Sequence, residues 1–209
     1  MIKALIFDLD NTIFATTTIS DEIFGPIYEL MEQYRINLSD EIIESIKSEL
    51  VRMPFQKIAD KYHFPAQLKS NGIELLKQTV YNKPVKPYKD YELARSTSVT
   101  KFLVTAGFTK LQQSKVDALG VRSDFKEVIV VDQEVTDETK RDVFARLMQK
   151  YGYEKDELIA VGDDPESEIG MARDLGIKTY LYDPESRFKS EGVTWHEQHY
   201  DKLVALLRS

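Results

Sequence analysis

Five short runs of aliphatic and aromatic residues recur along the chain. They lie at residues 2–7, 101–104, 128–131, 158–161 and, more weakly, 178–182. The first four are nearly continuous rather than alternating, as expected of strands that are covered on both faces in a parallel sheet. Amphipathic helical patterns lie between and after them, at 111–119, 140–150, 166–175 and 201–207. Strand alternating with helix predicts an α/β fold with a doubly wound, Rossmann-like parallel sheet.

The stretch 16–84 has a different pattern. It contains several apolar repeats of helical period, no strand-like run, and prolines that include Pro54, Pro65 and Pro84. We therefore expect an α-helical domain inserted directly after the first strand, covering 16–84. Residues 1–15 and 85–209 would then form the α/β core.

Composition and charge exclude several classes of function. The 209 residues carry a formal net charge of -7, which disfavours nucleic-acid and anionic-membrane partners. There are no cysteines, so thiol chemistry and thiolate-bound zinc are excluded. No signal-peptide pattern or membrane-length apolar segment occurs, and we expect a cytoplasmic protein.

Polar residues follow four of the predicted strands. Asp8 and Asp10 follow the first, Thr105 the second, Asp132 the third and Asp163 the fourth. The carboxyl ends of parallel strands share one edge, where open α/β sheets bind ligands. We therefore expect Asp8, Asp10 and Asp163 to crowd together.

Such a cluster requires a compensating cation. Two carboxylates about 4 Å apart repel by roughly 4 kcal/mol at an effective dielectric constant near 20. Because the candidate ligands are all oxygen atoms, the pattern favours Mg²⁺ over zinc. Protein-bound Mg²⁺ commonly contacts a substrate phosphate as well, so the pattern also favours phosphoryl chemistry.

Each motif alone also has a structural interpretation. An Asp-x-Asp is usually a turn or a cap, and Thr105 to Gly107 can be a strand-to-helix turn. Asp164 followed by Pro165 is typical of a helix start, with Asp164 as N-cap. The joint placement of the motifs at strand ends is what favours a functional site.

Four segments together resemble the motifs of haloacid-dehalogenase-like (HAD) hydrolases. Residues 8–12 resemble the Asp-x-Asp-x-Thr signature, and 103–107 the second motif, a hydrophobic strand ending in Thr or Ser. Lys140 is similar to the lysine of the third motif, and 161–169 resembles the fourth. The insertion at 16–84 matches the position of the family's helical C1-type cap domain.

The resemblance implies a magnesium-dependent phosphatase that hydrolyses the phosphate monoester of a small phosphorylated metabolite. Asp8 would be the nucleophile that forms an aspartyl-phosphate, and Asp10 the general acid and base. Asp8, the backbone carbonyl of Asp10 and Asp163 would hold Mg²⁺. The resemblance further implies that phosphate is bound by Thr105, Ala106, Gly107 and Lys140. The residues implied to hold these ligands in place are Thr12, Asp164 and Glu168. Because an ordinary Asp is too acidic to protonate an alcohol at neutral pH, we expect the site to raise the pKa of Asp10.

The chain departs from the family pattern in three ways. Ala106 stands where relatives commonly have Asn, and Glu168 where Asp is usual. Lys140 lacks the proline that frequently follows it, which leaves Lys110 or Lys115 as a substitute phosphate-binding lysine.

Other functions remain open at this stage. They are a phosphomutase or a phosphonatase of the same superfamily, or a non-catalytic relative that binds phosphate or metal. Asp10 favours a phosphatase over a dehalogenase, because dehalogenation releases no alcohol that needs a proton. Arg52, Gln56 and Lys57 could meet an anionic substrate, but a solvated helix face is the favoured interpretation. The substrate, the cap residues that select it and the oligomeric state are not indicated.

Overall fold

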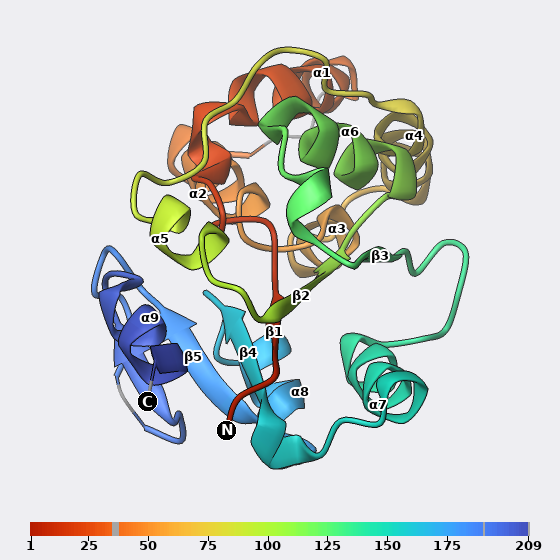
Figure 1. Ribbon diagram of the computed structural model, residues 1–209. Coiled ribbons are helices and arrows are strands. Elements are labelled where there is room, and N and C mark those ends of the chain that lie inside the picture. The colour runs from red at the N-terminus through yellow and green to blue at the C-terminus, as the bar shows by residue number, and fades with distance from the viewer. Residues whose placement is uncertain (35–37, 190, 209) are drawn as a thin grey trace.

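The computed structural model describes residues 1–34, 38–189 and 191–208 (Figure 1). A six-stranded sheet, in which every strand pairs in parallel, has the order β3-β2-β1-β4-β5-β6. The strands are β1 (Ala4–Phe7), β2 (Thr100–Ala106), β3 (Glu127–Val131), β4 (Leu158–Gly162), β5 (Lys178–Tyr182) and β6 (Trp195–Glu197). The predicted α/β fold class is confirmed. Sequence analysis did not predict β6.

Helices cover both faces of the sheet. They are α5 (Tyr91–Arg95), α6 (Thr109–Leu119), α7 (Lys140–Tyr151), α8 (Glu168–Asp174) and α9 (Asp201–Arg208), with short 3-10 turns at η2 (Arg122–Asp124) and η3 (Lys155–Glu157). Successive side chains of β1 point to opposite faces. Leu5 and Phe7 therefore join one buried cluster with residues of α5, α6 and α9, whereas Ala4 and Ile6 join a second cluster with α7 and α8.

The turn before α8 differs from the prediction. Asp164 Oδ1 accepts a hydrogen bond from the backbone N–H of Glu166 at 2.8 Å, as an N-cap would. The chain nevertheless makes a turn over Pro165 and Ser167, and regular helix begins only at Glu168. The predicted helix start at Pro165 was therefore too early.

The described part of the inserted segment consists of helices joined by turns and loops, without a strand. It contains η1 (Thr16–Thr18), α1 (Ser20–Gln33), α2 (Asp40–Leu50), α3 (Phe55–Lys61) and α4 (Ala66–Gln78). These helices gather at the top of Figure 1, beside α6. Their buried residues, such as Ile23 and Phe55, belong to the same apolar cluster as Phe7 of the sheet. A division into separate domains at 16 and 84 stays a prediction.

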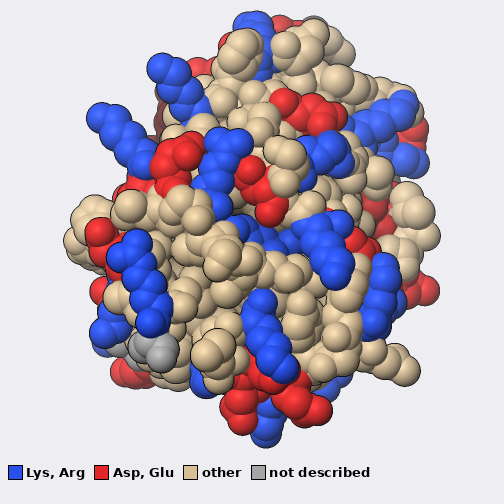
Figure 2. All heavy atoms as spheres, in the orientation of Figure 1, with Lys and Arg blue, Asp and Glu red and all other residues tan. Residues whose placement is uncertain are grey.

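The surface carries charges of both signs. On the face shown in Figure 2, Lys and Arg side chains are interspersed with Asp and Glu, without a continuous basic patch. Among the described residues, we find no helix with the length and apolarity needed to span a membrane.

We predict that Gly72 is required for packing of α4 on α3. A Cβ at position 72 would lie 2.3 Å from Cζ of the buried Phe55 ring. Gly72→Ala should therefore lower the free energy of unfolding by about 1–3 kcal/mol, measured by urea denaturation. Ser70→Ala, at an exposed position of the same helix, is the matched control and should change it by less than about 0.5 kcal/mol. Equal values for the two variants would contradict this packing.

Candidate active site

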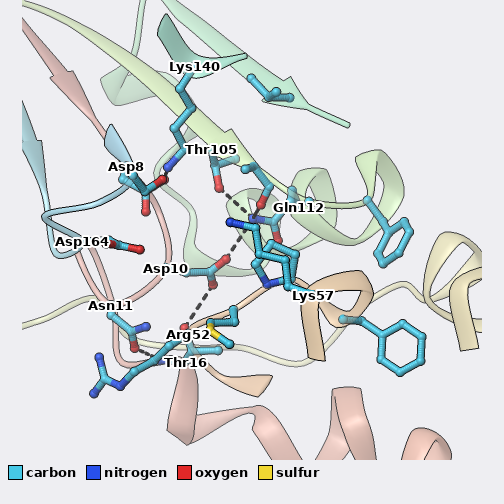
Figure 3. Close-up of a pocket in the computed structure, with 18 of the residues that line it drawn as sticks. Asp8, Asp10, Asn11, Thr16, Arg52, Lys57, Thr105, Gln112, Lys140 and Asp164 are labelled. Carbon is cyan, nitrogen blue, oxygen red and sulfur yellow. Dashed lines mark hydrogen bonds and ion pairs between the residues drawn. The ribbon is translucent and has the colours of Figure 1, made fainter. Parts of the chain in front are cut away.

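A cavity of about 480 Å³ lies between the carboxyl edge of the sheet and the inserted helices (Figure 3). This volume is within the usual range for small-molecule sites, roughly 300–1,000 Å³. Every residue predicted for the site, except Thr12, lines the cavity. The inserted helices contribute Arg52, Gln56 and Lys57 together with apolar side chains such as Phe24 and Phe55.

Three buried carboxylates converge on the floor of the cavity. Asp8, Asp163 and Glu168 each place an oxygen within 4.8 Å of the others. Asp8 and Asp163 come together because β1 and β4 are neighbours, and the Asp8 N–H donates to the carbonyl of Val161 at 2.9 Å. Glu168 fits because position 162 is glycine: a Cβ there would lie 2.1 Å from Glu168 Oε1.

Lys140 lies within this cluster. Its Nζ donates to Asp8 Oδ1 and to Glu168 Oε2, both at 2.8 Å. The two alternative lysines lie elsewhere: Lys110 is exposed and donates to a glutamine on α4, whereas Lys115 donates to Asp10. Of the three, Lys140 is the lysine that contacts Asp8.

The cluster has more negative charge than Lys140 compensates. Burial raises the pKa of Asp8 to about 7, although Lys140 opposes the shift. Burial and the nearby charges of Glu168 and Asp8 raise the pKa of Asp163 well above its usual range. Burial would also raise the pKa of Glu168, but Lys140 and backbone N–H donors outweigh it and lower that pKa. Lys140 therefore compensates Glu168, and Arg187 and Arg52 contact Asp163. The three convergent carboxylate oxygens suit a hard divalent cation such as Mg²⁺.

Asp10 lies apart from this cluster. Lys115 Nζ donates to its two carboxylate oxygens at 2.8 and 3.0 Å, Gln112 Nε2 to Oδ2 at 2.9 Å, and Thr16 Oγ1 to Oδ1 at 3.1 Å. Burial acts to raise the pKa of Asp10, but Lys115 and these hydrogen bonds outweigh burial and lower it. The expected upward shift was wrong, because a buried lysine that the sequence did not connect to Asp10 stabilises its charged form.

Thr12 does not brace Asp10 through its side chain. Its fully buried hydroxyl has no hydrogen-bond partner, although its backbone carbonyl accepts from the Tyr200 hydroxyl at 2.7 Å. Thr16 holds Asp10 instead, and its own N–H donates to Asn11 Oδ1 at 3.1 Å. Among the described residues, the one Thr12 hydrogen bond relevant to its expected supporting role is thus this backbone contact with Tyr200.

The three loop residues predicted to bind phosphate line the cavity, and the amide of one of them has a backbone partner. The backbone N–H of Gly107 donates to the carbonyl of Val131 at 3.0 Å, so this amide is already engaged. The expected contact between the Gly107 amide and a phosphate stays a prediction, and it would require this amide to exchange or share its acceptor. Thr105 is 1% exposed, and its Oγ1 accepts from Gln112 Nε2 at 2.7 Å.

Polar residues of the inserted helices also reach the site. Arg52 Nη1 lies 3.5 Å from Asp163 Oδ2, and its Nη2 lies 3.0 Å from Glu185. Gln56 Nε2 donates to Glu134 at 2.9 Å, and Lys57 lines the cavity (Figure 3). These three residues line the cavity, although Lys57 is also exposed, so their contact with a substrate stays a prediction.

Sequence reasoning missed Gln112 and Arg187 as contributors to the site, and it considered Lys115 only as a substitute phosphate-binding lysine, not as a partner of Asp10. Gln112 and Lys115 belong to an ordinary amphipathic helix pattern, and only their spacing of three residues indicated a shared face. Arg187, which lies 3.1 Å from Asp163 Oδ2, follows β5 in a loop without a recognisable motif.

Comparisons with known proteins agree with this geometry. Residues 5–182 match the model of the haloacid dehalogenase-like hydrolase family. The chain is 24% identical over 204 residues to glyceraldehyde 3-phosphate phosphatase of Methanopyrus kandleri, covering 86% of this chain and 83% of the relative. A stretch of 109 residues is 28% identical to pyrimidine 5'-nucleotidase YjjG of Escherichia coli, covering 50% of this chain and 48% of that protein.

A solved structure shares the whole fold. The magnesium-bound HAD-hydrolase YfnB of Bacillus subtilis aligns with a TM-score of 0.69 at 16% identity, over 100% of this chain and 99% of that chain. Since the family model matches most of the sequence, this chain belongs to the haloacid dehalogenase-like hydrolase family.

Proposed function

We propose that this hydrolase is a magnesium-dependent phosphatase, which cleaves the phosphate monoester of a small metabolite through an aspartyl-phosphate on Asp8. The observation that carries the proposal is the buried group of Asp8, Asp163 and Glu168 around Lys140, at the floor of a cavity that Asp10 also lines. The names of the two curated relatives, a phosphatase and a nucleotidase, support a small phosphorylated substrate.

Asp8 is the nucleophile in this proposal. Lys140 fixes the orientation of its carboxylate at 2.8 Å. Attack forms a bond between a carboxylate oxygen and phosphorus while the bond from phosphorus to the alcohol oxygen breaks. Splitting hydrolysis into transfer to Asp8 and release by water replaces one difficult step by two easier ones.

The acidic cluster fits Mg²⁺ by the chemistry of its donors. Asp8, Asp163 and the backbone carbonyl of Asp10 would hold the ion, while Glu168 keeps Lys140 in place. Bound Mg²⁺ supplies charge neutralisation for the carboxylates and the phosphate. The Thr105 hydroxyl, the Ala106 amide and Lys140 bind phosphate oxygens.

Asp10 transfers the protons. Its lowered pKa keeps it ionised, which suits the second step, in which it accepts a proton from the attacking water. In the first step it must donate a proton to the departing alcohol. The negative charge of a bound phosphate beside Asp10 raises its pKa toward the value that this step requires.

For the alternative function as a phosphonatase, the geometry reduces the number of candidate lysines. That chemistry needs a cap lysine that can form a Schiff base with the substrate. Lys57 lines the cavity, whereas Lys47, Lys61 and Lys69 pair with nearby carboxylates. Borohydride trapping of a Lys57 adduct with an aldehyde phosphonate would favour this alternative.

We predict that Asp8→Asn abolishes turnover while the protein stays folded. The wild type should release phosphate from p-nitrophenyl phosphate in the presence of Mg²⁺, and the variant should lose about 10⁴-fold or more in kcat, because the amide cannot attack phosphorus. Asp21→Asn, at an exposed position of α1, is the matched control and should keep full activity. Substantial Mg²⁺-dependent activity of Asp8→Asn would reject Asp8 as the nucleophile.

We also predict that Mg²⁺ stabilises the protein more at alkaline than at acidic pH. Without metal, the pKa of Asp8 is raised from 3.8 to about 7, so the folded protein holds a proton that the unfolded chain has released. Stability without metal therefore falls as the pH rises from about 4 to about 7. Because Mg²⁺ requires ionised carboxylates, the rise in Tm that it causes should be larger at about pH 8 than at about pH 5.5.

Thermal unfolding with Mg²⁺ or a chelator at both pH values measures this difference. Asp8→Asn is the control, since it removes the titrating carboxylate and should reduce the pH dependence of the Mg²⁺ effect. An Mg²⁺-induced shift in Tm that is the same at both pH values would contradict the predicted linkage.

A further inference from the structure

Two polar side chains of α6 are buried against the site. Gln112 and Lys115 are only 2% and 4% exposed, and their spacing of three residues places them on one face of the helix. Burying an ammonium group is costly unless it is paired. Both side chains find their partners at the carboxyl edge of the sheet rather than within α6 or in solvent.

Lys115 and its neighbours restrain the Asp10 carboxylate completely. Lys115 Nζ contacts both carboxylate oxygens, Thr16 holds Oδ1 and Gln112 holds Oδ2. Three donors on two different elements therefore oppose rotation of this carboxylate. Their combined effect is to fix which lone pairs of Asp10 face the cavity.

Gln112 connects Asp10 with Thr105. Its Nε2 lies 2.9 Å from Asp10 Oδ2, 2.7 Å from Thr105 Oγ1 and 3.1 Å from the Ala106 carbonyl. An amide nitrogen is a donor only, so Thr105 Oγ1 accepts from it and its own hydroxyl proton is left to another acceptor. Ala106 offers no polar side chain that could orient this hydroxyl.

Position 107 must be glycine for Gln112 to approach this closely. Gly107 has a φ of 142°, which L side chains rarely adopt, and a Cβ there would lie 3.2 Å from Gln112 Cδ. The turn after β2 is therefore shaped to receive the Gln112 side chain. This close packing against Gly107 restricts the position of the Gln112 side-chain amide.

We propose that Gln112 and Lys115 are positioning residues for the reaction: Lys115 aligns Asp10 for proton transfer, and Gln112 aligns both Asp10 and the Thr105 hydroxyl. The inference rests on the proposed phosphatase function. It predicts different defects for the two residues. Loss of Lys115 removes the charge that lowers the pKa of Asp10, but it also frees the carboxylate to rotate, and this misalignment should impair proton donation to the leaving alcohol. Loss of Gln112 should also weaken phosphate binding.

Substrates with different leaving groups test the role of Lys115. An alkyl phosphate needs a proton on its departing oxygen, whereas p-nitrophenolate leaves readily without one. Lys115→Met should lower kcat/KM for an alkyl phosphate by about 10²-fold, the usual contribution of a general acid, and for p-nitrophenyl phosphate by less than about 10-fold. Lys110→Met, which removes an exposed lysine of the same helix, is the matched control and should leave both values unchanged.

Inhibition by inorganic phosphate tests the role of Gln112. Gln112→Met should raise the inhibition constant of phosphate about 10-fold, as expected for one misplaced hydrogen bond to a charged group. Lys115→Met should leave this constant unchanged. Gln113→Met, at the neighbouring half-buried position, is the control and should behave like the wild type.

The outcomes separate the two proposals. Equal losses of kcat/KM for both leaving groups, or an unchanged phosphate inhibition constant in Gln112→Met, would overturn the positioning roles while the phosphatase stands. A wild type that releases phosphate from none of the substrates with Mg²⁺ would overturn the proposed function itself. Should Lys115→Met fail to fold, Lys115→Arg keeps the charge but displaces the donor, and it must show the same dependence on leaving group or the role of Lys115 is rejected.

Discussion

The contact of one buried ammonium with two buried carboxylates determines how the rest of the site is arranged. Lys140 lies 2.8 Å from both Asp8 and Glu168, and all three are nearly inaccessible to water. Isolated charges at such a depth would be very unfavourable, so each depends on the others. The third carboxylate, Asp163, does not contact Lys140 and lies 3.1 Å from Arg187 and 3.5 Å from Arg52. The convergence of three carboxylate oxygens within 4.8 Å of one another is the physical basis for expecting a cation.

The strand order explains why these groups meet. β1 lies between β2 and β4, so the residues after β1 lie beside the turns that follow both neighbouring strands. The helical insertion leaves the sheet at the same point. Asn11, in a left-handed conformation with a φ of 55°, donates to the Val51 carbonyl at 2.9 Å. The end of β1 thus holds Asp8, the proposed nucleophile, and also attaches the inserted helices.

Much of this arrangement could be predicted from the sequence, because continuous apolar runs report burial on both faces of a strand. The strands β1 to β5 and the gathering of Asp8 and Asp163 followed from that pattern. β6 could not be predicted, since Trp195–Glu197 is only three residues long and half-buried, and it pairs on one side only. The engagement of the Gly107 amide was also hidden, because it depends on the register of β2 against β3.

The protonation of the two aspartates of the signature motif shows most clearly what sequence leaves out. Asp8 and Asp10 are two residues apart in the same loop, yet the pKa of Asp8 is raised and that of Asp10 lowered. Each carboxylate faces a buried lysine at 2.8 Å. At Asp8, burial outweighs Lys140 and the nearby charge of Glu168 adds to the upward shift of the pKa. At Asp10, Lys115 and the hydrogen bonds from Gln112 and Thr16 outweigh burial. A motif specifies which residues stand at the site, but the balance of burial, neighbouring charges and hydrogen-bond donors around each carboxylate decides its protonation.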